Sequence, residues 1–411
     1  MHYTSIFGQK QRLYLDHAAA SELRSSVVRV VRQAEQMYTG NPSSLHHEGV
    51  VAGQALSKAR SSVTKIFEVQ ASEVIFTSGG TESDSLAILG SVRAVRDSFS
   101  QQSKTVHAVT TVIEHPAVLE AFKVLENEGV SVTYLGVDTE GRINQKELRE
   151  ALREETVLVS IGYVNSEIGT VQDIRECAKT IRHFRKHVGR SSFGVQFPLF
   201  HTDAAQATRL LSIRVPELGV DMLSCNGSKI GGPRGVGVLY VRKGIALSPL
   251  IVGGGQEYSL RSGTENVPAI VGFAQALTDV QKEKQLQNEK MLALRTLLQT
   301  LVQKEIPSAR CNGSAEFFLP STVSISLPKF ASELLVIELD ARGIAVSAGS
   351  ACSGVKENGS HVLSALYGKE DMDGWGTVRI SFGRNTTARD VRYFVRALKD
   401  VMEKYSAFLY T

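Results

Sequence analysis

A single lysine lies between a strand-like run and a turn rich in glycine and proline. Lys229 ends the small-residue stretch 224–229 and precedes the glycine-rich residues 230–235. A lysine among small residues can be partly desolvated, which lowers the pKa of its amine and makes it a nucleophile. An exposed turn lysine has the same local sequence, so Lys229 indicates a site only if chemical partners accompany it.

A carboxylate follows another strand-like run. Asp203 comes directly after residues 197–202. In open α/β sheets the carboxyl ends of the strands face the crevice where ligands bind, so the Asp203 side chain is expected to point into that crevice. Capping of the following helix is the simpler alternative for this residue.

Small, flexible residues separate a β-rich run from a helical pattern at residues 77–83. Unpaired N–H groups at a helix start carry the positive end of the helix dipole, and glycines let a phosphate approach them. Gly80 and Thr81 are therefore candidate phosphate ligands, through backbone and hydroxyl donors. Thr81 as a plain helix cap is the alternative. Glu82 lies where it could oppose an anion, so a phosphate here needs further donors.

Together these groups match the requirements of pyridoxal 5'-phosphate (PLP). A phosphate cradle anchors this cofactor, a carboxylate such as Asp203 keeps its pyridine nitrogen protonated, and a lysine such as Lys229 forms the imine. A ring against the cofactor face completes such a site. His115 follows a strand-like run and opens a helical one, so it is the candidate for that ring, with helix capping as the alternative.

A cysteine and an arginine in the last quarter of the chain narrow the chemistry. Cys352 lies in the Ser, Ala and Gly run 347–354, where no bulky neighbour buries it, so we expect a mobile, reactive thiol. Cys177, inside a helical pattern, is a structural candidate by contrast. Arg379 lies mid-strand, where a cation usually has a carboxylate partner from protein or substrate. An arginine on the solvent face of the strand is the alternative.

Strand and helix patterns alternate along most of the chain. This alternation predicts an α/β fold with a mostly parallel central sheet that is covered by helices on both faces. A long helical pattern at 267–304 follows the glycine break 253–255, and strand-like runs at 322–327 and 378–382 come after it, flanked by helices. The C-terminal pattern predicts a smaller α+β unit.

We therefore predict two domains, in agreement with a length of 411 residues, which exceeds what one hydrophobic core usually serves. The large domain is expected over 13–262 and binds the cofactor. The small domain is expected over 263–411, together with residues 1–12, and carries the cysteine loop.

The composition is that of an ordinary globular protein, with 42% apolar residues. A net charge of +4, from 46 basic and 42 acidic residues, gives no argument for binding nucleic acid. The four cysteines have no paired spacing, which disfavours a disulfide framework or a structural zinc site. No signal peptide or membrane span is recognised, and a cytoplasmic location is expected.

The ordered motifs resemble those of the cysteine desulfurases, class-V aminotransferase-like enzymes of PLP fold-type I that mobilise sulfur for iron–sulfur clusters and thiolated nucleosides. The resemblance covers nearly the whole chain. It rests on Tyr14-Leu15-Asp16-His17-Ala18-Ala19, Gly40-Asn41-Pro42-Ser43-Ser44, the phosphate loop, Glu114-His115, Asn165-Ser166-Glu167-Ile168-Gly169, Asp203-Ala204-Ala205-Gln206, the lysine loop, Arg261-Ser262-Gly263-Thr264 and the cysteine loop.

The resemblance implies roles for single residues. Lys229 is the Schiff-base lysine, Asp203 pairs with the pyridinium, and Gln206 contacts the ring oxygen. Cys352 attacks the sulfur of bound cysteine, leaving alanine and a persulfide on its own sulfur. The remaining roles are His115 stacking on the ring and serving in acid–base steps, Gly80 and Thr81 holding the phosphate, Arg379 clamping the substrate carboxylate with Asn165 near it, and Thr264 reaching the phosphate of the neighbouring subunit in a homodimer.

The chain also departs from the family pattern. Ser228 stands where histidine precedes the lysine, and Asn226 stands where serine is usual, although both can still donate to a phosphate. Ser166 and His17 each replace an asparagine. The long segment between Cys352 and Arg379 resembles the subgroup that hands sulfur to a scaffold or another acceptor protein.

Two other readings stay open at this point. One is another PLP lyase or aminotransferase of the same fold, such as a selenocysteine lyase. The other is a non-catalytic relative that only docks on a sulfur-transfer partner. Cys352 argues against an aminotransferase, and the joint presence of Lys229, Asp203, His115 and Cys352 argues against a docking protein.

Overall fold

The computed structural model describes residues 12–98, 105–188, 191–192, 195–349, 359–372 and 374–409. Cys352 and the rest of its loop therefore lie outside the described residues.

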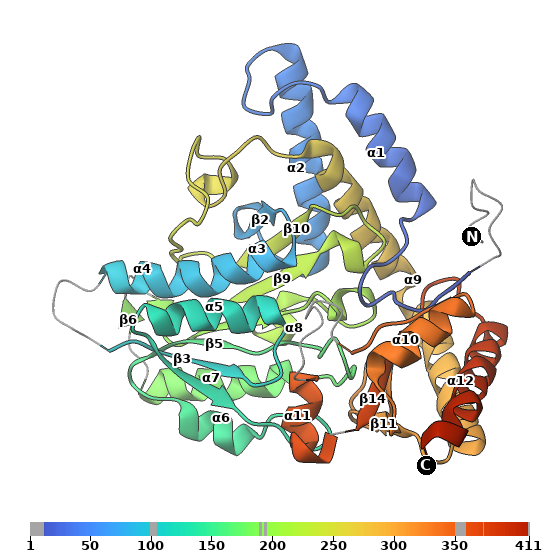
Figure 1. Ribbon diagram of the computed structural model, residues 1–411. Helices are drawn as coiled ribbons and strands as arrows, with labels where there is room; N and C mark the ends of the chain where they lie inside the picture. The colour runs from blue at the N-terminus through green and yellow to red at the C-terminus, as the bar shows by residue number, and fades with distance from the viewer. Residues whose placement is uncertain are drawn as a thin grey trace.

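A seven-stranded sheet forms the centre of the molecule (Figure 1). Its strands, in spatial order, are β2 (Val74–Thr77), β10 (Gly237–Val241), β9 (Met222–Asn226), β8 (Leu199–Asp203), β5 (Thr156–Ser160), β3 (His107–Thr111) and β4 (Ser131–Leu135). Strand β10 runs antiparallel to both of its neighbours, and all other neighbouring pairs are parallel. The predicted α/β fold with a mostly parallel sheet is confirmed.

Helices cover both faces of this sheet. One face packs against α4 (Ser91–Ser98) and α5 (Pro116–Asn127), and the other packs against helices that include α2 (His47–Phe67) and α7 (Ile174–His187). Consecutive residues of the buried strand β10 show the division, since Val238 belongs to one apolar cluster and Leu239 to the other. Further elements around the sheet are α1 (Ser25–Met37), α3 (Gly80–Ser85), α6 (Gln145–Ala151), β6 (Ser191–Ser192), β7 (Val195–Gln196) and α8 (Val215–Leu218).

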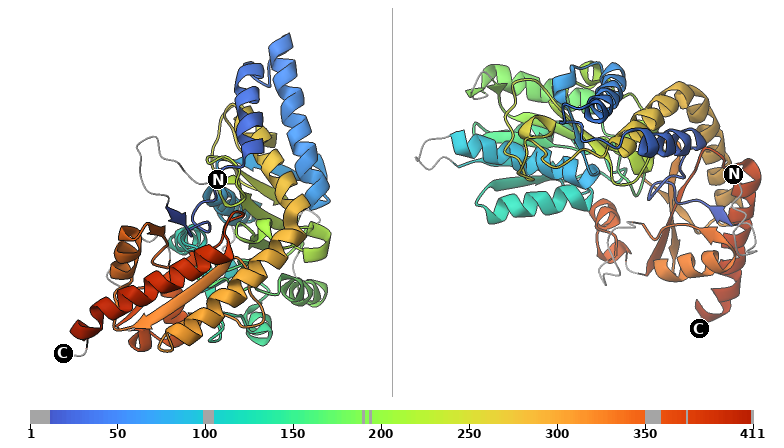
Figure 2. Two further views of the ribbon diagram at one scale, coloured as in Figure 1. Left: turned by 90° about the vertical axis from the view of Figure 1, so that its right-hand side faces the viewer. Right: turned by 90° about the horizontal axis from the view of Figure 1, so that it is seen from above.

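The C-terminal part has a second, antiparallel sheet of order β11-β12-β14. Figure 2 shows the long helix α9, in gold, running from beside the central sheet to this smaller part, where it lies against α12. The elements are α9 (Val267–Glu305), β11 (Arg310–Asn312), β12 (Thr322–Pro328), α10 (Ser332–Ala341), β13 (Ile344–Ala345), α11 (His361–Tyr367), β14 (Trp375–Ser381) and α12 (Ala388–Leu409). The α+β character agrees with the prediction, and the boundary at 262/263 stays a prediction.

The N-terminal end of the described chain joins the C-terminal part. Strand β1 (Leu13–Tyr14) pairs in parallel with β13, and Asp16 bridges to Ser381 beyond the end of β1. This connection brings the opening motif, residues 14–19, between the two sheets. Residues from both ends of the sequence can therefore form one site.

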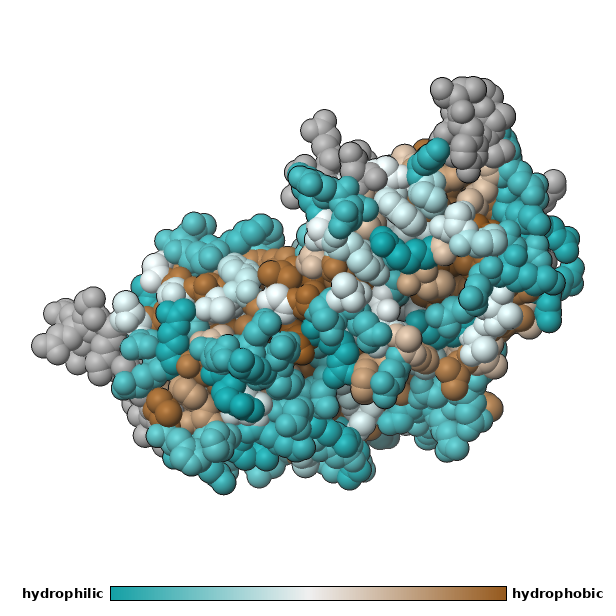
Figure 3. Space-filling view, turned by 90° about the horizontal axis from the view of Figure 1, so that it is seen from below, coloured by the Kyte–Doolittle hydropathy of each residue, from teal (hydrophilic) through white to brown (hydrophobic). Residues whose placement is uncertain are grey.

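The surface seen from below is mostly hydrophilic, with smaller hydrophobic areas between the polar groups (Figure 3). Among the described residues, no helix combines the length and the apolar character needed to cross a bilayer. The described residues also contain no cluster of His, Cys, Asp and Glu suited to a metal ion.

Candidate active site

A cavity of about 190 Å³ opens at the carboxyl ends of the central strands. In doubly wound sheets, this edge is where ligands bind. Most of the residues singled out from the sequence line it, although they come from segments far apart in the chain. They are Gly80, Thr81, His115, Asn165, Asp203, Gln206, Asn226, Lys229 and Arg379.

The turn that follows β9 positions Lys229. Strand β9 ends at Asn226, and residues 227–229 form a single 3₁₀ turn. The Asn226 Oδ1 atom accepts hydrogen bonds from Lys229 N at 3.2 Å and from Ser228 Oγ at 2.9 Å, which holds the turn together. Lys229 Nζ donates to the carbonyl oxygen of Ala19 at 2.6 Å, so the amine projects towards the opening motif.

Asp203 lies at the end of β8, the strand next to β9 in the sheet. The two strands are parallel, and Asp203 is opposite Ser224, so Asp203 and the Lys229 turn meet at the same edge. One oxygen of Asp203 accepts a hydrogen bond from Ala205 N at 2.8 Å. The carboxylate is only partly buried and faces the cavity.

The proposed phosphate cradle combines a helix start with the lysine turn. Helix α3 begins at Gly80 and continues through a π-helical segment into α4. A Cβ atom at position 80 would lie 3.0 Å from Asn226 Nδ2, so glycine lets this amide donor approach the helix start. Donors from two segments therefore surround one space, as a phosphate requires.

Glu82, next to the phosphate cradle, is paired within the protein and so does not repel a phosphate. Its Oε2 atom accepts a hydrogen bond from Ser78 N at 2.8 Å, and its Oε1 atom lies 3.0 Å from Arg261 Nε. The negative charge of Glu82 is thus paired within the protein. Arg261 belongs to the motif that also contains Thr264.

His115 caps a helix and also lines the cavity. Its Nδ1 atom accepts a hydrogen bond from Ala117 N at 3.1 Å and so caps helix α5, while the ring lines the cavity. The cap fixes the ring position at the cavity wall. Gln206 is also fixed, because its Nε2 atom donates to Ala18 O at 3.0 Å.

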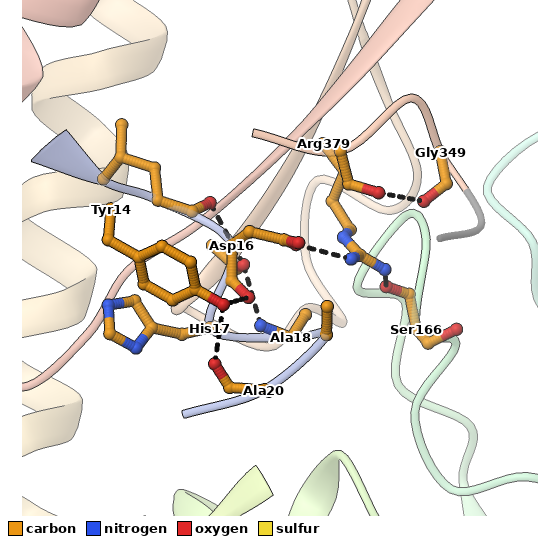
Figure 4. A network of polar contacts seen from close by, with 12 residues as sticks. Tyr14, Asp16, His17, Ala18, Ala20, Ser166, Gly349 and Arg379 are labelled. Atoms are coloured by element: carbon orange, nitrogen blue, oxygen red, sulfur yellow. Dashed lines mark hydrogen bonds and ion pairs between the residues drawn. The ribbon is translucent and has the colours of Figure 1, made fainter. Parts of the chain in front are cut away.

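Arg379 enters the cavity from β14 of the smaller sheet. Its Nη2 atom donates to Asp16 Oδ1 at 2.8 Å and its Nη1 atom donates to Ser166 O at 3.0 Å (Figure 4). The expected protein carboxylate is therefore Asp16. The side chain is 3% exposed, and within the described part of the chain its Nε atom has no hydrogen-bond partner.

Asn165 lines the cavity, but its polar atoms are engaged with the backbone. Its Nδ2 atom donates to Ile113 O at 2.9 Å, and its Oδ1 atom accepts from Glu167 N and Ile168 N. Asn165 therefore shapes the loop that presents the Ser166 carbonyl to Arg379. A role of Asn165 itself at the substrate carboxylate stays a prediction.

Two predicted residues lie outside the cavity wall, and a third lies outside the described residues. Ser228 does not line the cavity, and its hydroxyl donates to Asn226 Oδ1. Thr264 is exposed on the surface and also does not line it. The third residue is Cys352, whose loop is outside the described residues.

Two buried carboxyl groups at the cavity were not singled out from the sequence. Burial, followed by the negative charge of Asp203, raises the pKa of Asp84 well above its ordinary range. Burial also raises the pKa of Glu114 to about 7, although hydrogen bonds from Gly162 and Thr111 favour its anion. Asp84 follows Gly80 by one helical turn, which places both on one helix face and is the signal that sequence reading could have used.

These donors fit PLP. Lys229 would supply the amine, and Asp203 would supply a carboxylate for the ring nitrogen. The helix start at Gly80 and the amide of Asn226 would supply the phosphate donors. The close approach at Gly80 is the structural test of this fit, because a side chain there would fill the cradle. The cofactor assignment from the sequence agrees with this geometry.

Comparisons with known proteins agree with this site. A family model described as aminotransferase class-V matches residues 13–394. The cysteine desulfurase IscS of Dictyoglomus turgidum is 38% identical over 395 residues, which cover 96% of this chain and 95% of the relative.

Two solved structures extend the likeness to the fold. A NifS-like protein has a TM-score of 0.85 and 33% identity, with coverage of 96% of this chain and 100% of that one. A structure of SspA in complex with cysteine has a TM-score of 0.73 and 32% identity, with coverage of 90% and 98%. The family depends on PLP. This chain belongs to the class-V aminotransferase family, in which its relatives are cysteine desulfurases.

Proposed function

We propose that the chain is a PLP-dependent cysteine desulfurase, which converts L-cysteine to L-alanine and takes up the sulfur as a persulfide on Cys352. The observation that carries this proposal is the single cavity on which Lys229, Asp203 and Arg379 converge. The SspA structure with bound cysteine supports L-cysteine as the substrate, since that protein is 32% identical to this chain.

Bound PLP supplies an electron sink for negative charge that develops on the carbon atoms of an attached amino acid. Asp203, at the end of β8, would hold the proton on the ring nitrogen. Lys229 Nζ would be the nucleophilic amine that holds the cofactor, and its contact with Ala19 O orients it before cofactor binding. His115, fixed by its cap on α5, would pack against the ring face.

Arg379 binds the substrate carboxylate in this proposal. Its two Nη atoms are engaged with Asp16 and Ser166, which fixes the guanidinium plane. Its buried Nε atom has no acceptor in the described part of the chain, so a carboxylate oxygen supplies the missing partner. A charge-assisted bond of this kind selects amino acids with a free carboxylate.

The sulfur step balances without an external oxidant. The C–S bond of the substrate breaks, and its electron pair stays on the carbon atom, while an S–S bond to Cys352 forms. Of the two thiol protons, one ends on the methyl group of alanine and the other on the persulfide. L-Cysteine and the Cys352 thiol thus give L-alanine and the Cys352 persulfide. An acceptor protein then removes the terminal sulfur.

Mass spectrometry after incubation of the PLP-loaded protein with L-cysteine tests this function. We expect a mass gain of one sulfur atom on the peptide that contains Cys352, and L-alanine in solution. Cys311→Ser is the matched control, because it removes a described, exposed thiol that has no role in the proposal. A Cys352→Ala variant that still releases sulfide at the full rate contradicts the persulfide step.

The two other readings give different results. A selenocysteine lyase without desulfurase activity forms alanine from selenocysteine but not from L-cysteine. A docking protein shows no PLP absorbance after addition of PLP. Lys229 and Asp203 in one cavity favour the enzyme over the docking protein.

We also propose a homodimer with shared sites. Thr264 is exposed and lies outside its own cavity, as expected for a residue that reaches the phosphate of a second copy. Large apolar side chains are also exposed, with Leu45 96% and Val252 78% exposed. Such side chains on a surface favour a protein partner.

A reducing compartment suits this chemistry, and we propose the cytoplasm. Cys177, Cys225 and Cys311 are all free thiols. Cys177 and Cys225 are buried, and burial raises the pKa of each to about 12, which keeps them unreactive. The sulfur acceptor is proposed to be a scaffold or thiolation protein that approaches the segment between Cys352 and Arg379.

A further inference from the structure

A second cavity, of about 50 Å³, lies behind the opening motif and the lysine turn. Its wall contains three arginines from three separate segments, Arg24, Arg209 and Arg384, together with His17. A smaller space of about 10 Å³ shares His17 and Arg209 with it and also touches Gln206 and Lys229. Arg209 therefore lies between this cavity and the active site.

Arg209 has no carboxylate partner among the residues that the structure describes. In the described part of the chain, no carboxylate oxygen lies within ion-pair distance of its guanidinium, and Nη2 donates to the carbonyl of Phe382 at 2.8 Å. Burial, and next the charge of Arg24, lowers the pKa of Arg209 to about 10. Arg209 is still charged at neutral pH, so two cations face each other in a partly dehydrated space.

The carboxylates around the cavity do not balance these cations. Glu283 is shared, with Oε2 at 2.9 Å from Arg24 Nη1 and Oε1 at 3.7 Å from Arg384 Nη1. Glu22 is the carboxylate in the cavity wall itself. Three guanidinium groups thus meet two carboxylates, and burial of His17 lowers its pKa to about 3, so that its ring adds no charge.

We propose that this cavity is a binding site for a small tetrahedral oxyanion of the size of sulfate or phosphate. A guanidinium group matches such an anion because its N–H donors lie in one plane and can bind two oxygens at once. A volume of about 50 Å³ holds a few water-sized groups, which excludes a large organic ligand. The exposed Arg384 and Asn385 give the anion a path from solvent.

The site is linked to the active site through the backbone. Arg24 Nε donates to Ile230 O at 3.3 Å, and Ser21 Oγ donates to Lys229 O at 2.9 Å. The segment that carries Arg24 therefore lies along the lysine turn. An anion that fixes Arg24 also restrains the turn that holds Lys229, so we expect anion binding to raise the thermal stability of the protein.

Binding of inorganic sulfate to the PLP-loaded protein tests this site, because PLP then fills the phosphate cradle of the active site. We expect sodium sulfate to raise the melting temperature more than sodium chloride does at equal ionic strength. Arg209→Gln and Arg384→Gln should each weaken the sulfate affinity by at least about tenfold in titration calorimetry. Arg389→Gln, which removes an exposed arginine on α12, should leave it unchanged.

Two results overturn the proposal. One is an equal stabilisation by sulfate and chloride at matched ionic strength. The other is an unchanged sulfate affinity in Arg384→Gln, a partly solvent-exposed position whose replacement should not prevent folding. Since the measurement is binding and not turnover, it does not depend on the proposed desulfurase activity.

Discussion

Arg379 connects the two ends of the chain at the level of one side chain. Its ion pair with Asp16 and its bond to Ser166 O leave Nε as the donor for a substrate carboxylate. Lysine keeps the charge but lacks the planar set of donors. We expect Arg379→Lys to lower kcat/KM for L-cysteine by about 100-fold, mainly through KM.

The PLP absorbance of Arg379→Lys should stay that of the parent protein, because Arg379 does not hold the cofactor in this assignment. Steady-state kinetics and an absorbance spectrum of the same sample therefore show whether Arg379 binds the substrate or holds the cofactor. If the variant loses PLP, and the protein that retains PLP has an unchanged KM for L-cysteine, Arg379 holds the cofactor instead.

Glu114 gives a prediction for the pH dependence of stability. Burial raises its pKa to about 7 from the ordinary value of 4.5, so between these values the folded state binds more protons than the unfolded state. The contribution of Glu114 to the free energy of unfolding is therefore fully present below pH 4.5, and it is lost as the pH rises to about 7. The full effect is roughly 3 kcal/mol.

Glu114→Gln removes this titration. Urea unfolding of the PLP-free protein at pH 5 and pH 8 should show a smaller difference in the free energy of unfolding for this variant. Part of the difference between pH 5 and pH 8 should remain, because burial raises the pKa of Glu167 to about 7 as well. Glu147→Gln, at an exposed position, serves as the control. If Glu114→Gln shows the same difference between pH 5 and pH 8 as this control, Glu114 is ionised at both pH values.

At the scale of an element, the turn after β9 depends on one amide. Asn226 accepts from Lys229 N and Ser228 Oγ, and its Nδ2 atom faces Gly80. We expect Asn226→Ala to cost about 1 kcal/mol, as other lost caps do, and to weaken PLP binding by about tenfold. Denaturant unfolding and a PLP titration measure the two effects.

Asn226→Ser is the conservative comparison for this turn. Serine has a hydroxyl that can cap the turn and donate to a phosphate, so this variant should lie close to the parent protein in both measurements. Equal PLP affinity in Asn226→Ala and the parent protein would show that the amide does not contact the phosphate.

At the scale of the whole molecule, the exposed apolar side chains predict assembly. Val252→Asp and Leu45→Asp introduce charges where 78% and 96% of the parent side chains are exposed. If these surfaces are buried between two copies, each variant should shift the protein from dimer to monomer in light scattering, and PLP should be lost with it. Ile337→Asp, on α10 and 64% exposed, is the matched control and should stay dimeric.

The regular elements were the part of the fold that the sequence predicted best. The pattern at 267–304 predicted helix α9 almost to its ends, because helical periodicity persists over many residues. Short elements were missed, such as the three-residue strand β11. The strand-like run 197–202 also differs from the structure, where β8 begins at Leu199. Pro198 has no N–H to donate, so one continuous strand does not form there.

The sequence by itself determined the family, the cofactor and the chemical types of the site residues, because these depend on local turns and strand ends that short motifs encode. Tertiary structure decided which groups meet. The pairing of Arg379 with Asp16, the neutralisation of Glu82 by Arg261 and the burial of Asp84 and Glu114 join residues that no local pattern connects. Burial and distance set charge and pKa, and both arise only when the chain folds.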